Sequence, residues 1–285
     1  MTRLCALFTL FLLASGCATD TIEVDRLTAA ERTGYRATMR YAEVVAFVDD
    51  LARSPIAQRV SMGSTEEGRD LPVLVIADPP VATPERAMER GKVRFFAFGG
   101  IHSGEACGKE ALLMLARDVV TNPDAPRNRK LLDGAVLMIA PLYNADGNER
   151  VSPDNRTNQV GPESGMGERA NVDGLDLNRD YMKLASAEGR SMARFLTEWD
   201  PHVVFDSHTT NGSHHQYTLT FDGALNPSGA TEPMAYTRHE FLPDVSARME
   251  RETGYKSFYY GNFNNDMTRW GTYSHLPRFG ASYVG

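Results

Sequence analysis

Three short polar motifs carry residue types that bind metals and activate water. They are His102-Ser103-Gly104-Glu105, Asp176-Leu177-Asn178-Arg179 and Asp206-Ser207-His208. Two histidines and one glutamate form the ligand set of a catalytic zinc site, in which a fourth position stays open. His102 and Glu105 stand close enough in the sequence for one tight turn to direct both side chains at the same ion. His208 lies about a hundred residues further on, so the fold must bring it to the other two.

The elements expected around these motifs are apolar strands that alternate with helices. We predict strands over 71–77, 93–99, 134–142 and 202–206, and helices over 41–53, 107–120, 186–198 and 237–253. Strands that are apolar throughout are typical of an α/β sheet covered by helices on both faces. The first and third motifs directly follow two of the strands, where open α/β sheets place their ligand crevice.

The second motif ends a long polar stretch, from Asn144 to Tyr181, that has no helical or strand periodicity. A connection of this length is uncommon in a compact domain and is usually functional. Because it follows a predicted strand, we expect it to lie at the same edge of the sheet as the two histidine motifs.

The composition excludes several classes of protein. The chain has 285 residues, a formal charge of −7 at pH 7, 42% hydrophobic residues and 24% charged residues. These values exclude a disordered chain, a fibrous repeat and a protein with many membrane spans. The acidic balance argues against a general nucleic-acid binder, which needs a net-basic face for phosphate contacts.

The N-terminus has the pattern of an export signal. Arg3 precedes an apolar run over 4–13, and small residues follow at 14–16, which predicts a signal peptide over 1–16. The position of Cys17 after Ala-Ser-Gly resembles a bacterial lipoprotein cleavage box, which implies lipidation of Cys17 and a membrane anchor in the bacterial cell envelope. The alternative is an ordinary secretory signal with an incidental cysteine. We expect a leader over 17–40 and one domain over 41–285.

Taken together, the motifs resemble those of the zinc carboxypeptidase family, the carboxypeptidase A-like metallopeptidases. The resemblance runs from about residue 41 to the end, and it is carried by HSGE at 102–105, NADG at 144–147, R-x₆-D-x-N-R at 169–179 and DSH at 206–208. It implies an α/β/α sandwich with a mixed, largely parallel sheet. It also implies one zinc ion per chain, held by His102, Glu105 and His208.

The resemblance implies roles for residues of the second motif and the segment before it. Asp176 matches the carboxylate that orients the first ligand histidine. Asn178 and Arg179 match the pair that binds the free C-terminal carboxylate of a peptide or cell-wall peptide. Arg169 matches the arginine that polarises the scissile carbonyl, and Arg156 competes with it for that role. The implied activity is that of a zinc-dependent metallocarboxypeptidase.

Two catalytic groups of the family belong to its C-terminal region. Tyr273 is the candidate for the proton-donating tyrosine, whereas no glutamate matches the general base before the chain stops at Gly285. We therefore expect a fragment whose last strand and helix are absent; a complete chain that binds zinc and peptide without turnover is the alternative. A zinc amidohydrolase acting on N-acyl amino acids is a further alternative, because that group shares the H-x-x-E…H ligands.

Overall fold

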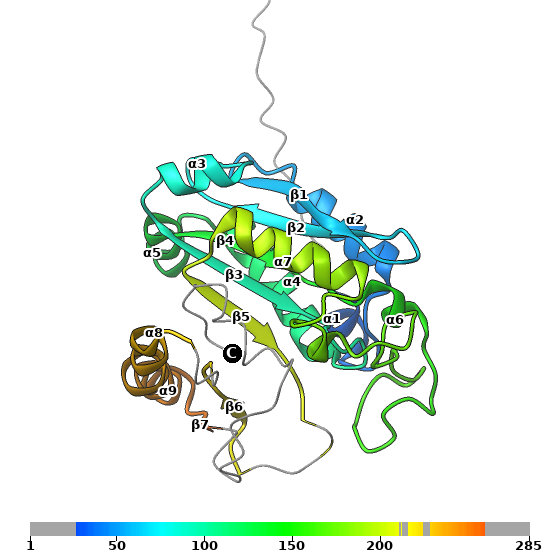
Figure 1. Ribbon diagram of the computed structural model, residues 1–285. Coiled ribbons are helices and arrows are strands. Elements are labelled where there is room, and N and C mark those ends of the chain that lie inside the picture. The colour runs from blue at the N-terminus through cyan, green and yellow to red at the C-terminus, as the bar shows by residue number, and fades with distance from the viewer. Residues whose placement is uncertain (1–26, 211, 213–215, 225–228, 260–285) are drawn as a thin grey trace, which may run out of the picture.

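The centre of the molecule is a mixed five-stranded sheet (Figure 1). The computed structural model describes residues 27–210, 212, 216–224 and 229–259. The strands lie in the order β1-β2-β4-β3-β5, with β1 at Ala57–Ser64, β2 at Asp70–Ile76, β3 at Val93–Gly99, β4 at Ala135–Ala140 and β5 at Val203–Ser207. β3 pairs in parallel with both β4 and β5, whereas β2 runs antiparallel to β1 and β4.

The register of β3 with β5 sets the place of the candidate site. Phe98 pairs with Asp206 and Gly99 pairs with Ser207, so the two strands end side by side. The chain that leaves β3 carries the first histidine motif, and the chain that leaves β5 carries the third. The sequence-predicted meeting of these motifs at one sheet edge is therefore confirmed by the pairing itself.

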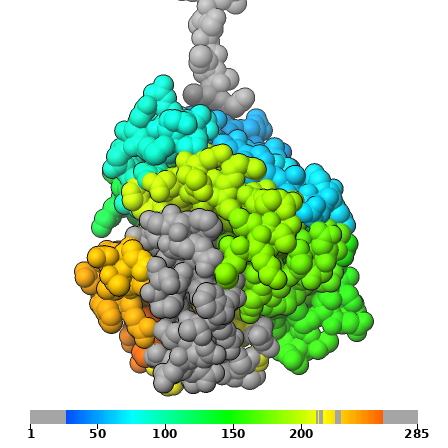
Figure 2. Space-filling view, in the orientation of Figure 1, coloured from blue at the N-terminus to red at the C-terminus, as the bar shows by residue number. Residues whose placement is uncertain are grey.

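Helices cover both faces of the sheet. Helix α7 (Ala187–Trp199) lies in front of the sheet, and α2 (Tyr41–Leu51) and α4 (Ala106–Thr121) lie behind it (Figure 1). In α7, Ser186 caps the first turn by accepting a hydrogen bond from Gly189 N, and the helix buries Met192, Phe195 and Trp199. Helix α7 also runs across the face turned to the viewer in Figure 2, and the segment before it forms the right side of that face.

Short elements connect these layers. Helix α3 covers Pro84–Glu89, α5 covers Pro126–Gly134, α6 covers Ala145–Glu149, and a 3₁₀ turn, η1, covers Leu177–Arg179. Beyond β5, the strands β6 (Leu219–Phe221) and β7 (Ser257–Tyr259) form a small parallel pair. None of the helices in the described part of the chain combines the length and the apolar character needed to cross a membrane.

The predicted strands and helices are present, but the structure contains further elements, and one helix begins earlier than expected. Strand β1 was not predicted because its residues alternate between buried and exposed positions and several of them are polar, as suits an edge strand. The helix expected over 237–253 begins earlier, with α8 at Thr231–Tyr236, and passes through a π-helical turn, η2 at Thr237–Phe241, into α9 at Leu242–Thr253. Pro243 lacks the N–H that a regular α-helix would donate to His239.

The packed structure begins before the expected boundary at residue 41. The short helix α1 (Ala29–Thr33) starts with a capping box at Thr28, and Ala29, Ala30 and Met39 are buried. Arg117 of α4 donates two hydrogen bonds of 2.7 Å to the Glu31 carboxylate. The polar composition of this segment predicts a leader. In the structure, its buried residues and the hydrogen bonds between Arg117 and Glu31 hold residues 28–39 against α4. The predicted signal peptide, Cys17 and Tyr273 lie outside the described residues.

Candidate metal centre

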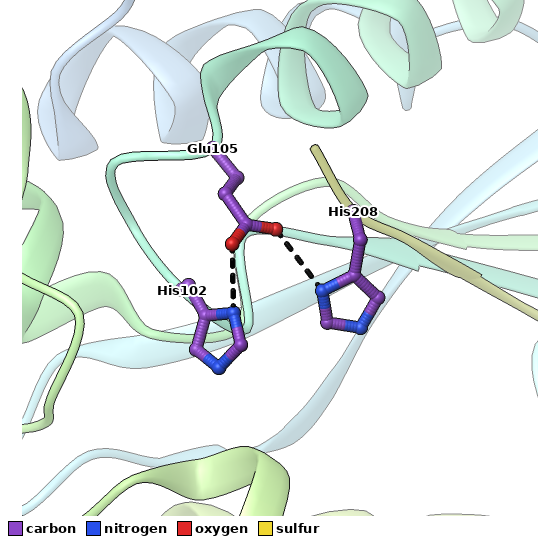
Figure 3. A group of neighbouring side chains, drawn as sticks. All are labelled: His102, Glu105 and His208. Atoms are coloured by element: carbon purple, nitrogen blue, oxygen red, sulfur yellow. Dashed lines mark hydrogen bonds and ion pairs between the residues drawn. The ribbon is translucent and has the colours of Figure 1, made fainter. Parts of the chain in front are cut away.

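The side chains of His102, Glu105 and His208 meet at the carboxyl ends of β3 and β5 (Figure 3). Glu105 lies between the two rings, with Oε1 2.9 Å from His102 Nδ1 and Oε2 3.0 Å from His208 Nδ1. One potential ligand atom from each residue lies within 4.8 Å of the others. The structure thus brings together the three residues that the sequence singled out as metal ligands.

Local backbone features hold this arrangement. Glu105 N donates a 2.9 Å hydrogen bond to His102 O, which closes the turn between β3 and α4. Gly108, in the first turn of α4, lies against the end of β5, where a Cβ atom would stand 2.2 Å from Ser207 Oγ. A glycine is therefore required at position 108 for α4 to approach β5, and this approach places Glu105 between the two histidines.

The donor set fits zinc. Two imidazole nitrogens and a carboxylate are the ligands that catalytic zinc sites use, with a further position left for water or substrate. His102 and Glu105 are almost fully buried, whereas the His208 side chain is 23% exposed, so the group is open on that side. Within the described residues, it is the one group of at least three His, Cys, Asp or Glu side chains whose ligand atoms converge in this way.

Electrostatic coupling inside the group is strong. Burial raises the pKa of Glu105, but hydrogen bonds with His102 and His208 outweigh it and hold that pKa well below the usual range. Burial lowers the pKa of His208, but Asp206 and Glu105 outweigh it and raise the pKa to about 10. His208 is then protonated at neutral pH before a metal binds, and a metal must displace that proton.

Each histidine also has a carboxylate on its other ring nitrogen. Asp176 Oδ1 lies 3.1 Å from His102 Nε2, and Asp206 Oδ2 lies 2.8 Å from His208 Nε2. Asp176 caps η1 by accepting a 2.9 Å hydrogen bond from Asn178 N. Burial raises the pKa of Asp176, but His102 and Arg169 outweigh it and lower that pKa below the usual range. The structure places Asp176 where the sequence expected it.

Arg156 and Arg169, the two candidates for the carbonyl-polarising role, lie near different ligands of the group. Arg169 donates to Asp176 Oδ2 from Nε and Nη2, at 3.1 and 2.9 Å, and its Nη1 lies 3.4 Å from His102 Nδ1. Arg156 donates a 2.6 Å hydrogen bond to Glu105 Oε1 and has a side chain only 9% exposed, whereas that of Arg169 is 39% exposed. Arg169 is therefore the more exposed of the two arginines, and Arg156 is packed against a ligand.

The remaining residues of the second motif lie beside His208. Asn178 is buried, and its Nδ2 lies 3.5 Å from His208 Nε2. Arg179 is exposed and donates a 2.8 Å hydrogen bond from Nη1 to Asn178 O. The 3₁₀ turn η1 therefore presents a buried amide and an exposed guanidinium from neighbouring residues.

Two supports of the site lie in the segment between β4 and α7, and sequence reasoning assigned this role to neither of them. Asn144 caps α6 and donates from Nδ2 to the backbone oxygens of Arg169 and Ala170, at 3.2 and 3.1 Å. The NADG motif marked this asparagine without giving it a role. The other support is the contact of Arg156 with Glu105, for which residue spacing offers no signal because Arg156 sits in an irregular segment with a positive φ of 55°.

Comparisons with known proteins agree on one family. The zinc carboxypeptidase model of peptidase family M14 matches residues 44–223. Carboxypeptidase 2 of Trichophyton rubrum is 28% identical over 164 residues, which are 57% of this chain and 27% of that protein. Carboxypeptidase D of Homo sapiens is 32% identical over 133 residues, which are 46% of this chain and 9% of that protein.

Similarity to solved structures extends to the fold. A metallo-carboxypeptidase from Burkholderia cenocepacia superposes with a TM-score of 0.62 and 19% identity, covering 85% of this chain and 59% of that chain. The matches to the two sequence relatives span about a quarter of the relative's length or less. The sheet and the helices on both faces are thus those of metallo-carboxypeptidases.

Proposed function

This chain belongs to the zinc carboxypeptidase family, and we propose that it is a zinc-dependent metallocarboxypeptidase that hydrolyses the C-terminal peptide bond of peptides. The observation that carries the proposal is the convergence of His102, Glu105 and His208. Asn178 Nδ2 lies 3.5 Å from His208 Nε2, and Arg169 Nη1 lies 3.4 Å from His102 Nδ1. A metal centre, an exposed arginine and a buried amide at one sheet edge support this proposal.

The three ligands would hold the ion through two Nδ1 atoms and one carboxylate. Bound zinc supplies Lewis acidity toward the scissile carbonyl and lowers the pKa of a bound water. Asp176 accepts a hydrogen bond from His102 Nε2 when that nitrogen carries the proton, which leaves the Nδ1 lone pair free for the metal. Asp176 therefore fixes the tautomer that the proposed site requires.

Arg169 is the group that we assign to the scissile carbonyl. Asp176 holds its guanidinium by two hydrogen bonds, and Nη1 faces the ligand His102. A donor held in advance at the place where negative charge develops contributes roughly 3–4 kcal/mol to lowering the barrier. The exposure of the Arg169 side chain supports this assignment over Arg156, which is committed to Glu105.

Asn178 and Arg179 are the groups that we assign to the substrate carboxylate. A planar guanidinium binds a carboxylate through two parallel hydrogen bonds, which a lysine does not reproduce. Arg179 is exposed and stands next to Asn178, which supports binding of the carboxylate at this turn. This recognition restricts cleavage to the last residue of a peptide or cell-wall peptide with a free C-terminus.

The test compares one peptide with a free C-terminus with the same peptide as a C-terminal amide. The zinc-loaded protein is incubated with each, and mass spectrometry follows release of the last residue. We expect release from the free acid only, with loss of activity in a chelator and in the Arg179→Ala variant. Cleavage of N-acyl amino acids without cleavage of peptides would favour the amidohydrolase, and zinc-dependent peptide binding without release would favour the non-catalytic binder.

We also propose that the chain is exported and anchored through a lipid on Cys17. The support is the sequence pattern over residues 1–17. Cells that express the chain are fractionated after labelling with a fatty acid. The protein should be labelled in the membrane fraction, and Cys17→Ala should remove the label; a labelled Cys17→Ala protein would contradict the assignment.

A further inference from the structure

Asp206 is a carboxylate at a buried position of a strand. The residues of β5 alternate in burial, and Val204 and Asp206 share the buried side. The Asp206 side chain is only 1% exposed. Aspartate is almost never buried to this degree without a partner, so its contacts should show what it does.

The partner of Asp206 is the ligand His208. Residues two apart along an extended chain project toward the same side, so the local backbone already directs the two side chains together. Asp206 Oδ2 lies 2.8 Å from His208 Nε2. The other oxygen, Oδ1, is buried and has no hydrogen-bond partner within the described residues.

Fold stability alone does not account for this carboxylate. A buried polar atom without a partner costs about 1–3 kcal/mol, and an apolar side chain of similar size would avoid that cost. The aspartate therefore stands at a position where the surrounding packing favours an apolar residue, and its side chain is hydrogen-bonded to a proposed metal ligand.

The same arrangement occurs at the other histidine. His102 has Nδ1 at Glu105 Oε1 and Nε2 at Asp176 Oδ1; His208 has Nδ1 at Glu105 Oε2 and Nε2 at Asp206 Oδ2. The two carboxylates differ in origin, because Asp176 comes from a separate segment and Asp206 from the ligand's own strand. The two rings nevertheless present the same nitrogen to the centre of the group.

We propose that Asp206 is the positioning residue of His208: its carboxylate accepts a hydrogen bond from Nε2–H and thereby directs the Nδ1 lone pair toward the metal. The inference rests on the proposed zinc function. It gives each ligand histidine its own carboxylate, and it assigns to Asp206 an effect on metal binding that a purely structural residue would not have.

The experiment measures zinc affinity by competition with a chromogenic chelator at constant pH, without peptide substrate. Asp206→Ala should weaken zinc binding by about 10–100-fold, the usual effect of losing such a partner. Asp206→Asn should lose much less, because the amide oxygen can still accept the hydrogen bond from Nε2. The Co²⁺-loaded Asp206→Ala protein should also show a shifted visible spectrum, since the ligand field changes when His208 is no longer held.

A matched control is Glu110→Gln. Glu110 is also a buried carboxylate, but it accepts hydrogen bonds from Thr38 Oγ1 and Met39 N, away from the ligands. The Glu110→Gln protein should lose thermal stability and keep the zinc affinity and the Co²⁺ spectrum of the wild type. If Asp206→Ala does not fold, the comparison of Asp206→Asn with Glu110→Gln takes its place, and the small expected loss is read from the Co²⁺ spectrum.

The outcomes separate this inference from the proposed function. Wild-type affinity and spectrum in both Asp206 variants would overturn the role of Asp206 and leave the zinc site intact. Equal losses in the Asn and Ala variants would also overturn it, because the amide retains the acceptor. Failure of the wild-type protein to bind zinc would instead overturn the proposed function itself.

Discussion

The proposed metal ligands and the proposed substrate-binding groups are positioned in different ways. His102, Glu105 and His208 stand at the ends of β3 and β5 and at the start of α4. Arg169 and Asn178 stand in the long segment between α6 and α7, whose short turns are held by side chains bonded to backbone. Strand register therefore determines the metal geometry, whereas a few individual hydrogen bonds determine where a substrate would be held.

This difference makes distinct predictions for substitutions in the two regions. Changes at the strand ends should act on metal binding, and changes in the segment between α6 and α7 should act on catalysis while metal binding remains. Changes in the packing away from both regions should act on stability.

Glu105→Ala should have the largest effect. It removes the carboxylate that lies between the two histidines and leaves His208 Nδ1 without its carboxylate partner. We expect zinc affinity to fall by more than the roughly 10–100-fold that loss of an outer partner causes, with no measurable peptide hydrolysis. Isothermal titration measures the zinc affinity, and mass spectrometry measures peptide hydrolysis. Tight stoichiometric zinc binding by the variant would contradict the ligand assignment.

Arg169→Ala should reduce catalysis while zinc binding is kept. Loss of a donor of this kind lowers kcat by roughly 10²–10³-fold. The matched variant is Arg156→Ala, which removes a hydrogen bond to Glu105 and should change zinc affinity as well as rate. Steady-state kinetics and zinc titration on both proteins decide between the arginines, and a reversed pattern would give the carbonyl role to Arg156.

Asn144→Ala should also reduce kcat, because Asn144 holds the backbone of Arg169. The variant loses the cap of α6, at a cost of about 1 kcal/mol, and the two bonds that hold the backbone at 169 and 170. Misplacement of a catalytic group by about 1 Å can reduce the rate roughly 100-fold. We expect a fall in kcat up to that size with unchanged zinc affinity; a change in zinc affinity would show that the two regions are not independent.

Zinc affinity should depend on pH through His208. Asp206 and Glu105, acting against burial, raise its pKa in the metal-free chain to about 10, so the proton must leave when zinc binds. Below that pKa, the dissociation constant should fall about tenfold for each unit of pH increase, per proton released. Competition titrations between pH 6 and 8 measure the slope, and a slope near zero would show that His208 is neutral before zinc binds.

Lys109 joins α4 to α6 and to the N-terminal segment, and its substitution should have the smallest effect. It lies in α4, near Glu105, and donates to Met39 O at 2.5 Å and to Asn148 Oδ1 at 2.7 Å. Burial lowers its pKa to about 8. Between pH 8 and its unfolded pKa near 10.4, the unfolded chain binds the extra proton, so this residue makes the folded state more stable as pH rises.

The Lys109 contribution is isolated by comparison with Lys109→Met. The difference in unfolding free energy between the two proteins should shift in favour of the wild type by up to about 1.4 kcal/mol per pH unit above pH 8. Denaturant unfolding at several pH values measures it. A difference that stays constant from pH 8 to 10 would contradict the lowered pKa.

The sequence predicted the strand-end residues better than the others. An apolar run followed by His102 and Glu105, or by His208, marks both the element and the residue at its end. The register that pairs Gly99 with Ser207 was not predictable, because several pairings of short apolar strands bury the same surface. The zinc group itself therefore followed from the sequence, but its supports, Asp206 and Gly108, required the structure.

The irregular segment was harder to interpret because it lacks periodicity. Spacing could not decide between Arg156 and Arg169, whose positions depend on long-range bonds such as that of Asn144 to the backbone at residue 169. The packing of the segment before residue 41 was equally hard to predict, because only a few buried residues, such as Ala29 and Met39, stand in a sequence that is polar overall.

The most direct test of the account is X-ray absorption spectroscopy of the zinc-loaded protein at one ion per chain. We predict two imidazole nitrogens and oxygen donors at about 2.0–2.2 Å, as expected for His102, His208 and Glu105 with one open position. His208→Ala should lose one imidazole from that shell. A shell with sulfur at about 2.3 Å, or one that His208→Ala leaves unchanged, would contradict the assignment of the metal centre.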